Sequence, residues 1–283
     1  MPRSALFERI EDWTAAYDNR AAVAGFEAYL KAWQRSAEAA ADALGARLSV
    51  HAYGPHARQR FFLARPAEDA PRGLAVFVHG GYWRTLEPES FLHLALGPLA
   101  RGFAVALPGY RLAPEVAIPE IARDVATALT AAAAAVADGP ILLAGHSAGG
   151  HLVARQACSA FPLPAEVAAR LAHAVTISGL HDLRPLLGAA VNEDLRLDLA
   201  TAAAESPALL RPRADLPITV WVGAEELLAF RRQALLLATA WHGLGAPMAL
   251  VEDAGRHHFG ILDTLAEPEG ALTAALFAPL DGG

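Results

Sequence analysis

The chain has 283 residues, of which 54% are hydrophobic, and it carries a formal net charge of −7. This length and apolar content can bury a large core in one α/β domain, although length alone also permits two, and the acidic balance disfavours nucleic acid or a membrane as a partner. The single cysteine, Cys158, excludes an internal disulfide, and the charges of Arg3, Glu8 and Arg9 leave no room for the apolar core of a signal peptide, so we expect a cytoplasmic protein.

A helical pattern covers residues 1–45, which we interpret as an N-terminal extension. Phe26, Leu30 and Trp33 follow one another at i, i+4 and i+7, as on one face of an amphipathic helix. This stripe indicates contact with a core rather than a site for a partner. Two strands are predicted next, over residues 46–51 and 58–64.

A third strand, over residues 73–78, runs directly into a His-Gly-Gly-Tyr-Trp segment at positions 79–83. In hydrolases with a His-Gly-Gly loop after a strand, backbone N–H groups of this loop bind the oxyanion, together with the N–H of the residue after the nucleophile. The candidates here are Gly81, Tyr82 and Ala148. Taken alone, the glycine pair also fits an ordinary tight turn.

A fourth strand is predicted over residues 103–107, and an apolar stretch without charges follows at 125–137. This stretch is shorter than the ~20 residues that a membrane span needs, so it predicts a buried helix.

The most informative segment is the apolar strand 141–144, which breaks into Gly-His-Ser-Ala-Gly at 145–149 before a helical stretch at 152–160. This pattern is typical of a nucleophile elbow, in which a serine sits on a sharp strand-to-helix turn. Ser147 is therefore the candidate nucleophile. Its hydroxyl needs a base beside it, an acid behind the base, and donors for the oxygen that becomes negative.

Further strands are predicted over 174–178, 218–222 and 248–251, alternating with helical stretches. Such alternation predicts an α/β fold whose mostly parallel central sheet has helices on both faces. The interval 181–216 lacks a clean strand, and we interpret it as a small helical insert over the site within one domain spanning residues 1–283.

The acid is expected after the strand 218–222, where Glu225 and Glu226 compete. Glu226 has the spacing from Gly223 that places a carboxylate on the loop beyond a strand end. Glu225 fits equally well a first-turn residue that interacts with the helix dipole. We favour Glu226 and keep Glu225 as the alternative.

The base is expected after the last strand, where His257 and His258 are adjacent. We favour His258, because the neighbouring Phe259 can anchor the loop in the core. No Cys, His and carboxylate set has metal-ligand spacing, so we expect neither a metal nor a cofactor.

Together these motifs resemble the α/β-hydrolase superfamily, and within it most closely the kynurenine formamidase (arylformamidase) branch. Tyr82 stands where lipases of the hormone-sensitive type carry a third glycine, and Gly109 departs from the aspartate that is common in the esterases. The segments that carry the resemblance are 79–83, 108–115, 145–151, 178–183, 206–207 and 255–259.

The resemblance implies a serine hydrolase with a triad of Ser147, Glu226 and His258 that hydrolyses N-formylkynurenine or a related N-formyl aryl amine. The candidates for the aryl side of the site, each of which fits core packing equally well, are Tyr17, Tyr82, Trp83, Tyr110 and Phe259. A general carboxylesterase and a non-catalytic ligand-binding protein of the same fold are the alternatives. The oligomeric state stays open, a homodimer included.

Overall fold

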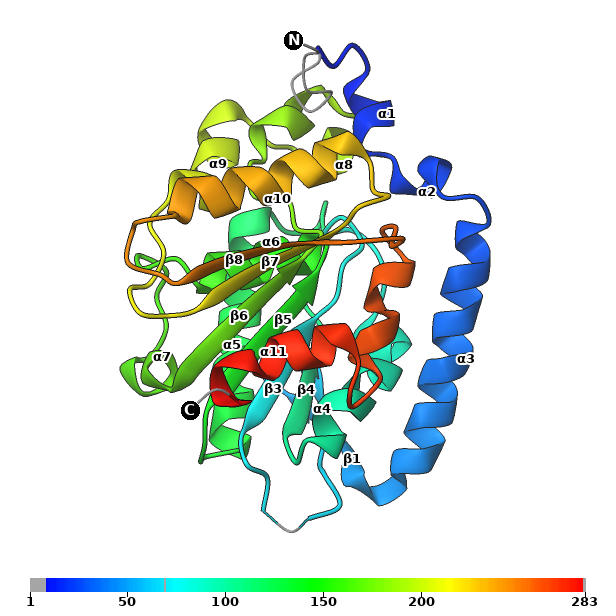
Figure 1. Cartoon of the computed structure of the whole chain (residues 1–283), viewed down its shortest axis with the longest axis vertical. Helices are drawn as coiled ribbons and strands as arrows, with labels where there is room; N and C mark the ends of the chain where they lie inside the picture. Colours follow the sequence, from blue (N-terminus) through cyan, green and yellow to red (C-terminus); the bar gives the residue numbers. More distant parts are fainter. Residues whose placement is uncertain (1–8, 69, 282–283) are drawn as a thin grey trace.

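The computed structural model describes residues 9–68 and 70–281, so positions 1–8 of the expected extension lie outside the described residues. One eight-stranded sheet runs through the molecule in the order β1-β2-β4-β3-β5-β6-β7-β8 (Figure 1). The strands from β3 onward are parallel, whereas β2 pairs antiparallel with both β1 and β4. Their bounds are β1 Leu48–Ala52, β2 Arg60–Ala64, β3 Leu74–Val78, β4 Ala104–Pro108, β5 Ile141–His146, β6 Leu171–Ile177, β7 Ile218–Gly223 and β8 Met248–Asp253.

All eight strands lie where the apolar runs predict them. The largest difference in a strand start is at β6, which begins at Leu171 rather than at position 174. The extra residues include His173, whose ring nitrogens bond to the Leu276 carbonyl at 3.0 Å and to Thr219 Oγ1 at 3.0 Å. A histidine with both ring nitrogens satisfied can occupy a buried strand position, which residue hydrophobicity alone does not indicate.

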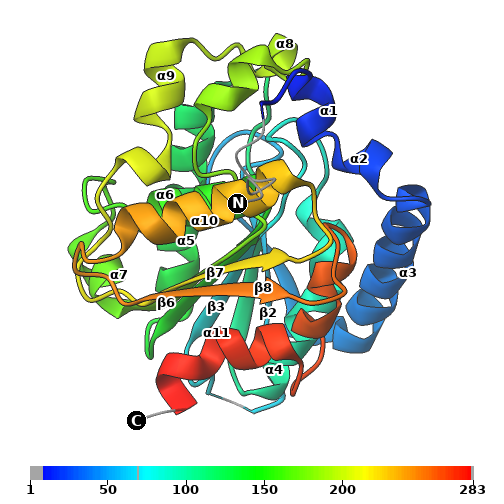
Figure 2. The ribbon, with the colours of Figure 1, turned by 45° about the horizontal axis from the view of Figure 1, so that its top comes forward.

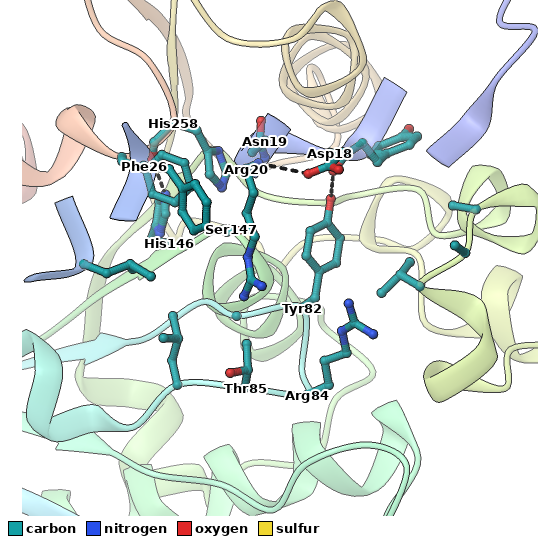
Figure 3. A pocket seen from close by; sticks show the side chains of 18 of the residues that line it. Asp18, Asn19, Arg20, Phe26, Tyr82, Arg84, Thr85, His146, Ser147 and His258 are labelled. Atoms are coloured by element: carbon teal, nitrogen blue, oxygen red, sulfur yellow. Dashed lines mark hydrogen bonds between the residues drawn. The ribbon is translucent and has the colours of Figure 1, made fainter. Parts of the chain in front are cut away.

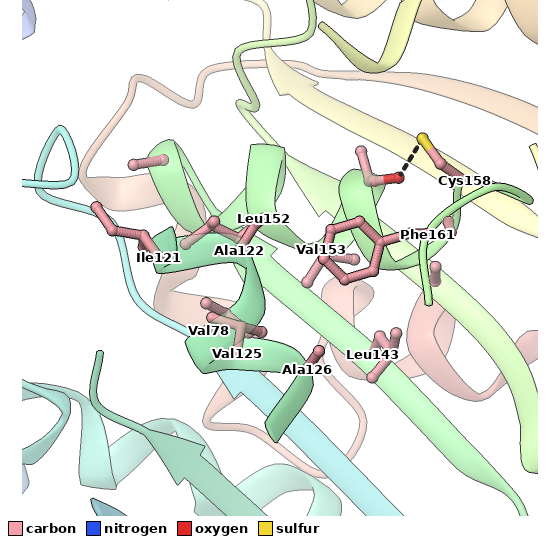
Figure 4. Packing of buried hydrophobic residues seen from close by; sticks show 14 of the residues in the cluster. Val78, Ile121, Ala122, Val125, Ala126, Leu143, Leu152, Val153, Cys158 and Phe161 are labelled. Atoms are coloured by element: carbon pink, nitrogen blue, oxygen red, sulfur yellow. Dashed lines mark hydrogen bonds between the residues drawn. The ribbon is translucent and has the colours of Figure 1, made fainter. Parts of the chain in front are cut away.

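Alternating side chains of the central strands pack into two separate cores. Along β3, Leu74, Val76 and Val78 belong to one core, while Ala75 and Phe77 belong to the other. This is the period of two that a strand imposes on its side chains. Figure 4 shows part of the first core, where Val78 and Leu143 of the sheet meet side chains of the helices.

Helices cover both faces of the sheet. The first core receives α5 (Ile118–Ala135), α6 (Ala148–Gln156) and α10 (Leu228–Trp241), and the second receives α3 (Phe26–Leu44) and α11 (Ala271–Asp281). The remaining helices are shorter, namely α1 Trp13–Tyr17, α2 Asn19–Ala22, α4 Leu96–Ala100, α7 Ala165–Arg170, α8 Asn192–Leu195 and α9 Leu199–Ala204. The 3₁₀ helices are η2 Gly45–Arg47, η3 Pro88–Ala95, η4 Arg184–Gly188, η5 Pro207–Leu209 and η6 Gly260–Leu265.

The interval 181–216 contains η4, α8, α9 and η5 and no strand. In Figures 1 and 2, α1, α8 and α9 lie at the same end of the molecule, and α3 runs along its side. Within the described ranges, no helix combines the length and the apolar character that a membrane crossing requires.

Candidate active site

Ser147 sits on a tight turn between β5 and α6, with a backbone φ of 56° and ψ of −118°. This is a strained conformation for a residue with a side chain and costs on the order of 1–3 kcal/mol. The turn is held by the Ser147 N–H, which donates to the Ile177 carbonyl of β6 at 2.8 Å. A side chain on Gly149 would lie 2.0 Å from the Val78 carbonyl, so helix α6 can approach β3 only with glycine at this position.

The structure brings Glu226, and not Glu225, to His258. His258 Nδ1 lies 2.7 Å from Glu226 Oε2, and both side chains are buried. Glu225 is exposed, and its backbone N–H donates to the Arg256 carbonyl. A carboxylate can only accept, so Nδ1 carries the hydrogen and Nε2 of the neutral ring is left as an acceptor.

The second oxygen of Glu226 is also occupied. Its Oε1 accepts from the Ser178 hydroxyl at 2.6 Å and from the Gly223 N–H at 2.8 Å. Three donors thus hold one carboxylate in a single orientation, which satisfies a buried charge. The sequence predicted no catalytic role for Ser178. This residue follows β6 directly, and the pairing of β6 with β7 brings it to Glu226.

His258 is also held by its neighbours. Its ring packs against Phe230 and His146, with centroids 4.7 Å and 4.6 Å apart, and its carbonyl accepts from His146 Nε2 at 2.9 Å. Burial, followed by the neighbouring His258, lowers the pKa of His146 well below its usual value, so this ring is neutral. His257 turns the other way, and its Nε2 lies 2.9 Å from the Tyr29 hydroxyl of α3.

The loop after β3 comes close to Ser147. A side chain on Gly80 would lie 3.0 Å from the Ser147 Cβ atom. Gly81 and Tyr82 both have positive φ, 111° and 51°, and neither N–H has a protein acceptor among the described residues. Ala148 is the first residue of α6, where an N–H has no partner inside the helix. The three N–H groups are therefore available to a ligand.

Trp83 and Tyr110, two of the expected aryl-side residues, lie in the core instead. Both are fully buried and neither lines the pocket at Ser147. The Tyr110 hydroxyl donates to the His79 carbonyl at 2.9 Å, and the Tyr110 ring stacks on that of His79 with centroids 4.4 Å apart. Trp83 packs edge-on against His151. These aromatic side chains pack against the core side of the loop. Burial lowers the pKa of His79 to about 3, so its ring is neutral.

A pocket of about 400 Å³ opens at Ser147, His146 and His258 (Figure 3). Of the predicted residues, Tyr17, Gly81, Tyr82 and Phe259 also line it. The amphipathic stripe of α3 makes the predicted contact with the core and also supplies most of the apolar wall of the pocket. This wall comprises Phe26, Leu30, Trp33, Leu86 and Phe259.

The opposite wall is polar and comes from the ends of α1 and α2. Asn19 is 4% exposed and its side-chain Nδ2 has no hydrogen-bond partner in the described chain, while Arg20 extends across the pocket (Figure 3). Arg84 lines the pocket too, but it is paired with Asp194. No sequence signal marks Asn19 or Arg20, because both lie on a one-turn helix far from every motif. Among the described residues, no three His, Cys, Asp or Glu side chains gather as metal ligands.

Comparison with known proteins places this arrangement in context. The family model for the alpha/beta hydrolase fold matches residues 75–260. The kynurenine formamidase of Danio rerio is 27% identical over 234 residues, which cover 79% of this chain and 78% of that protein. A solved structure of a candidate thioesterase from Silicibacter sp. is 45% identical, with a TM-score of 0.88 and coverage of 93% and 98% of the two chains. Esterase LipW from Mycobacterium marinum, at 18% identity, has a TM-score of 0.68, with coverage of 89% and 88%.

Proposed function

We propose a serine hydrolase mechanism for this chain, which belongs to the α/β-hydrolase fold family. The observation that carries the proposal is the buried pair of His258 and Glu226 at the pocket that also contains Ser147. The pair leaves Nε2 of His258 as a proton acceptor at the pocket that Ser147 also lines, and nucleophilic catalysis by a hydroxyl requires such a base.

In this mechanism His258 Nε2 takes the proton of Ser147 as the Ser147 oxygen attacks the acyl carbon. Glu226 orients the ring and stabilises its positive form, while the N–H groups of Gly81, Tyr82 and Ala148 hold the oxyanion. His258 then gives the proton to the leaving nitrogen or oxygen. In the second half of the reaction water attacks the acyl carbon, and His258 takes a proton from the water and returns it to Ser147 as the acyl group leaves. Each oxyanion donor contributes about 3 kcal/mol to transition-state stabilisation.

We propose N-formyl aryl amines, with N-formylkynurenine as the first to test, as the substrate class. Kynurenine formamidases of Danio rerio and Salmo salar are similar to this chain over more than two thirds of its length. The pocket supports this choice, because aromatic side chains stand beside Ser147 while Asn19 and Arg20 offer polar partners for the amino-acid part of such a molecule. A formyl group needs little room on the acyl side.

The test compares kcat/KM for N-formylkynurenine with kcat/KM for p-nitrophenyl acetate, butyrate and hexanoate on the purified protein. A formamidase should prefer the formamide and should lose activity sharply as the acyl chain lengthens. Cleavage of p-nitrophenyl hexanoate as efficient as that of the acetate, with no deformylation of N-formylkynurenine, would reject the formamidase function.

The second candidate is an esterase or thioesterase with the same machinery. The solved structure at 45% identity is of a candidate thioesterase, and the apolar wall of Phe26, Leu30 and Trp33 can accommodate more than a formyl group. The ester series above, extended to an acyl thioester, separates this function from deformylation because an amide nitrogen is the worse leaving group and requires protonation by His258.

A further inference from the structure

The loop that carries two of the candidate oxyanion donors contains consecutive residues with a left-handed backbone conformation. Gly81, Tyr82 and Trp83 all have positive φ, of 111°, 51° and 56°. Two of these three residues are large aromatics, for which the left-handed region is unfavourable. Such a loop persists only when the surrounding structure holds it.

One side of the loop is held by the core. The Trp83 ring is fully buried against His151, and the backbone carbonyl of Trp83 accepts from the Ala113 N–H at 2.8 Å. The other side is held by the N-terminal segment. The Tyr82 hydroxyl donates to the carbonyl of Tyr17, the last residue of α1, where a helix leaves its carbonyls without partners.

Tyr17 is itself anchored to α10, beside the candidate active site. Its side chain is 3% exposed, its hydroxyl accepts from Gln233 Nε2 at 3.0 Å, and its ring packs edge-on against Phe230 at 5.7 Å. Gln233 is fully buried on α10 and also binds the backbone N–H groups of residues 181 and 182. Phe230 in turn contacts the His258 ring.

We propose that Tyr17 and the phenol of Tyr82 form a clamp that positions the oxyanion-binding N–H groups of Gly81 and Tyr82. This inference rests on the proposed function. Because the phenol and the N–H belong to the same residue, the hydrogen bond to Tyr17 limits rotation of the Tyr82 peptide and so keeps its N–H directed at the oxyanion. The phenol of Tyr82 is a positioning group, and burial raises its pKa, which keeps it a donor at every working pH.

The test replaces Tyr82→Phe, which keeps the ring in the pocket wall and removes only the hydrogen bond to Tyr17. We expect kcat on the best ester or formamide substrate to fall about 10-fold, part of the 10²–10³ that a lost oxyanion donor costs, while KM changes by less than about twofold. Tyr17→Phe, which loses only the Gln233 contact, should give a smaller fall in the same direction.

A trifluoromethyl ketone gives an independent reading. Ser147 Oγ adds to its carbonyl carbon, the carbonyl electron pair becomes the oxyanion, and the hydroxyl proton moves to His258. Its inhibition constant should rise by the same factor as kcat/KM falls, because both depend on the oxyanion donors.

Tyr53→Phe is the matched control. The Tyr53 hydroxyl donates to the Gly109 carbonyl at 2.7 Å, outside the pocket, so its loss should lower stability to a similar extent and leave kcat unchanged. A wild-type kcat in Tyr82→Phe, a raised KM at unchanged kcat, or an equal fall in Tyr53→Phe would overturn the clamp while leaving the proposed hydrolase intact. A wild-type protein inactive on every acyl substrate would instead reject the proposed function, and the clamp with it.

Discussion

Acid should unfold this protein over a narrow pH range, because several histidines are buried in their neutral form. Desolvation lowers the pKa to about 3 in His79, His151 and His181 and to about 4 in His93. An unfolded histidine titrates near pH 6.5. Between pH 6.5 and 4 the unfolded chain therefore binds protons that the folded chain does not. The free energy of unfolding has its full value above pH 6.5 and decreases as the pH falls from 6.5 towards 4.

The loss is large on the scale of protein stability. At pH 5.5 each of these four histidines lowers the free energy of unfolding by about 1.4 kcal/mol, or about 6 kcal/mol together, against a usual total of about 5–15 kcal/mol. Urea titrations followed by tryptophan fluorescence at pH 8, 7, 6 and 5.5 measure this directly. The urea midpoint should change little from pH 8 to 7 and then fall steeply.

The replacement His93→Gln isolates one of these protons. His93 lies outside the pocket, and burial is the cause of its lowered pKa. The variant should lose less stability between pH 7 and 5.5 than the wild type, by about 1.2 kcal/mol. His242→Gln, which changes an exposed histidine, is the control and should leave the slope unchanged. A free energy of unfolding that stays constant from pH 8 to 5.5 would show that these histidines do not have lowered pKa values in the folded protein.

Four further predictions concern the site. Ser147→Ala should lower kcat by about 10⁴ or more with the fold intact by circular dichroism, and near-normal turnover would reject the nucleophile. Glu226→Gln should lower kcat by about 10⁴, whereas Glu225→Gln should stay within about threefold; the reverse ranking would move the acid to Glu225. Ser178→Ala removes one donor to the Glu226 carboxylate, so kcat should fall about 10-fold at constant KM, and an unchanged kcat would contradict a positioning role. Arg20→Gln should raise KM for N-formylkynurenine about 10-fold and leave KM for p-nitrophenyl acetate unchanged, and equal effects on both would count against a contact of Arg20 with the amino-acid part of the substrate.

The centre of the site can be predicted from the sequence because local backbone geometry determines it. The turn at Ser147 needs small neighbours, and the Gly-x-Ser-x-Gly spacing shows this directly. Glu226 and His258 follow strands whose carboxyl ends meet at one edge of a parallel sheet, so their proximity follows from the order of the strands. The choice between Glu225 and Glu226 follows from the same spacing beyond a strand end.

The walls of the pocket depend on tertiary packing that no short segment shows. Asn19 and Arg20 reach the pocket only because α1 and α2 dock across the end of the sheet. Trp83 and Tyr110 stand as close to the motifs in sequence as Tyr82, yet they are buried on the far side of the loop. The Trp83 ring packs against His151 and the Tyr110 ring against His79, and these partners are distant in sequence. Such contacts decide which side of the loop faces the pocket.

The pocket is built from two sets of parts with different freedoms to change. The candidate reacting groups stand at strand ends, where the neighbouring backbone restricts them, as the 2.0 Å approach at Gly149 illustrates. The surfaces that would meet the rest of a substrate come largely from α1 to α3 and from residues 189–193, which contain none of the strands. On the proposed function, the positions of these segments that face the pocket are the natural starting point for altering selectivity in the laboratory, provided that the core contacts of α3 and the contact of Tyr82 with Tyr17 are kept.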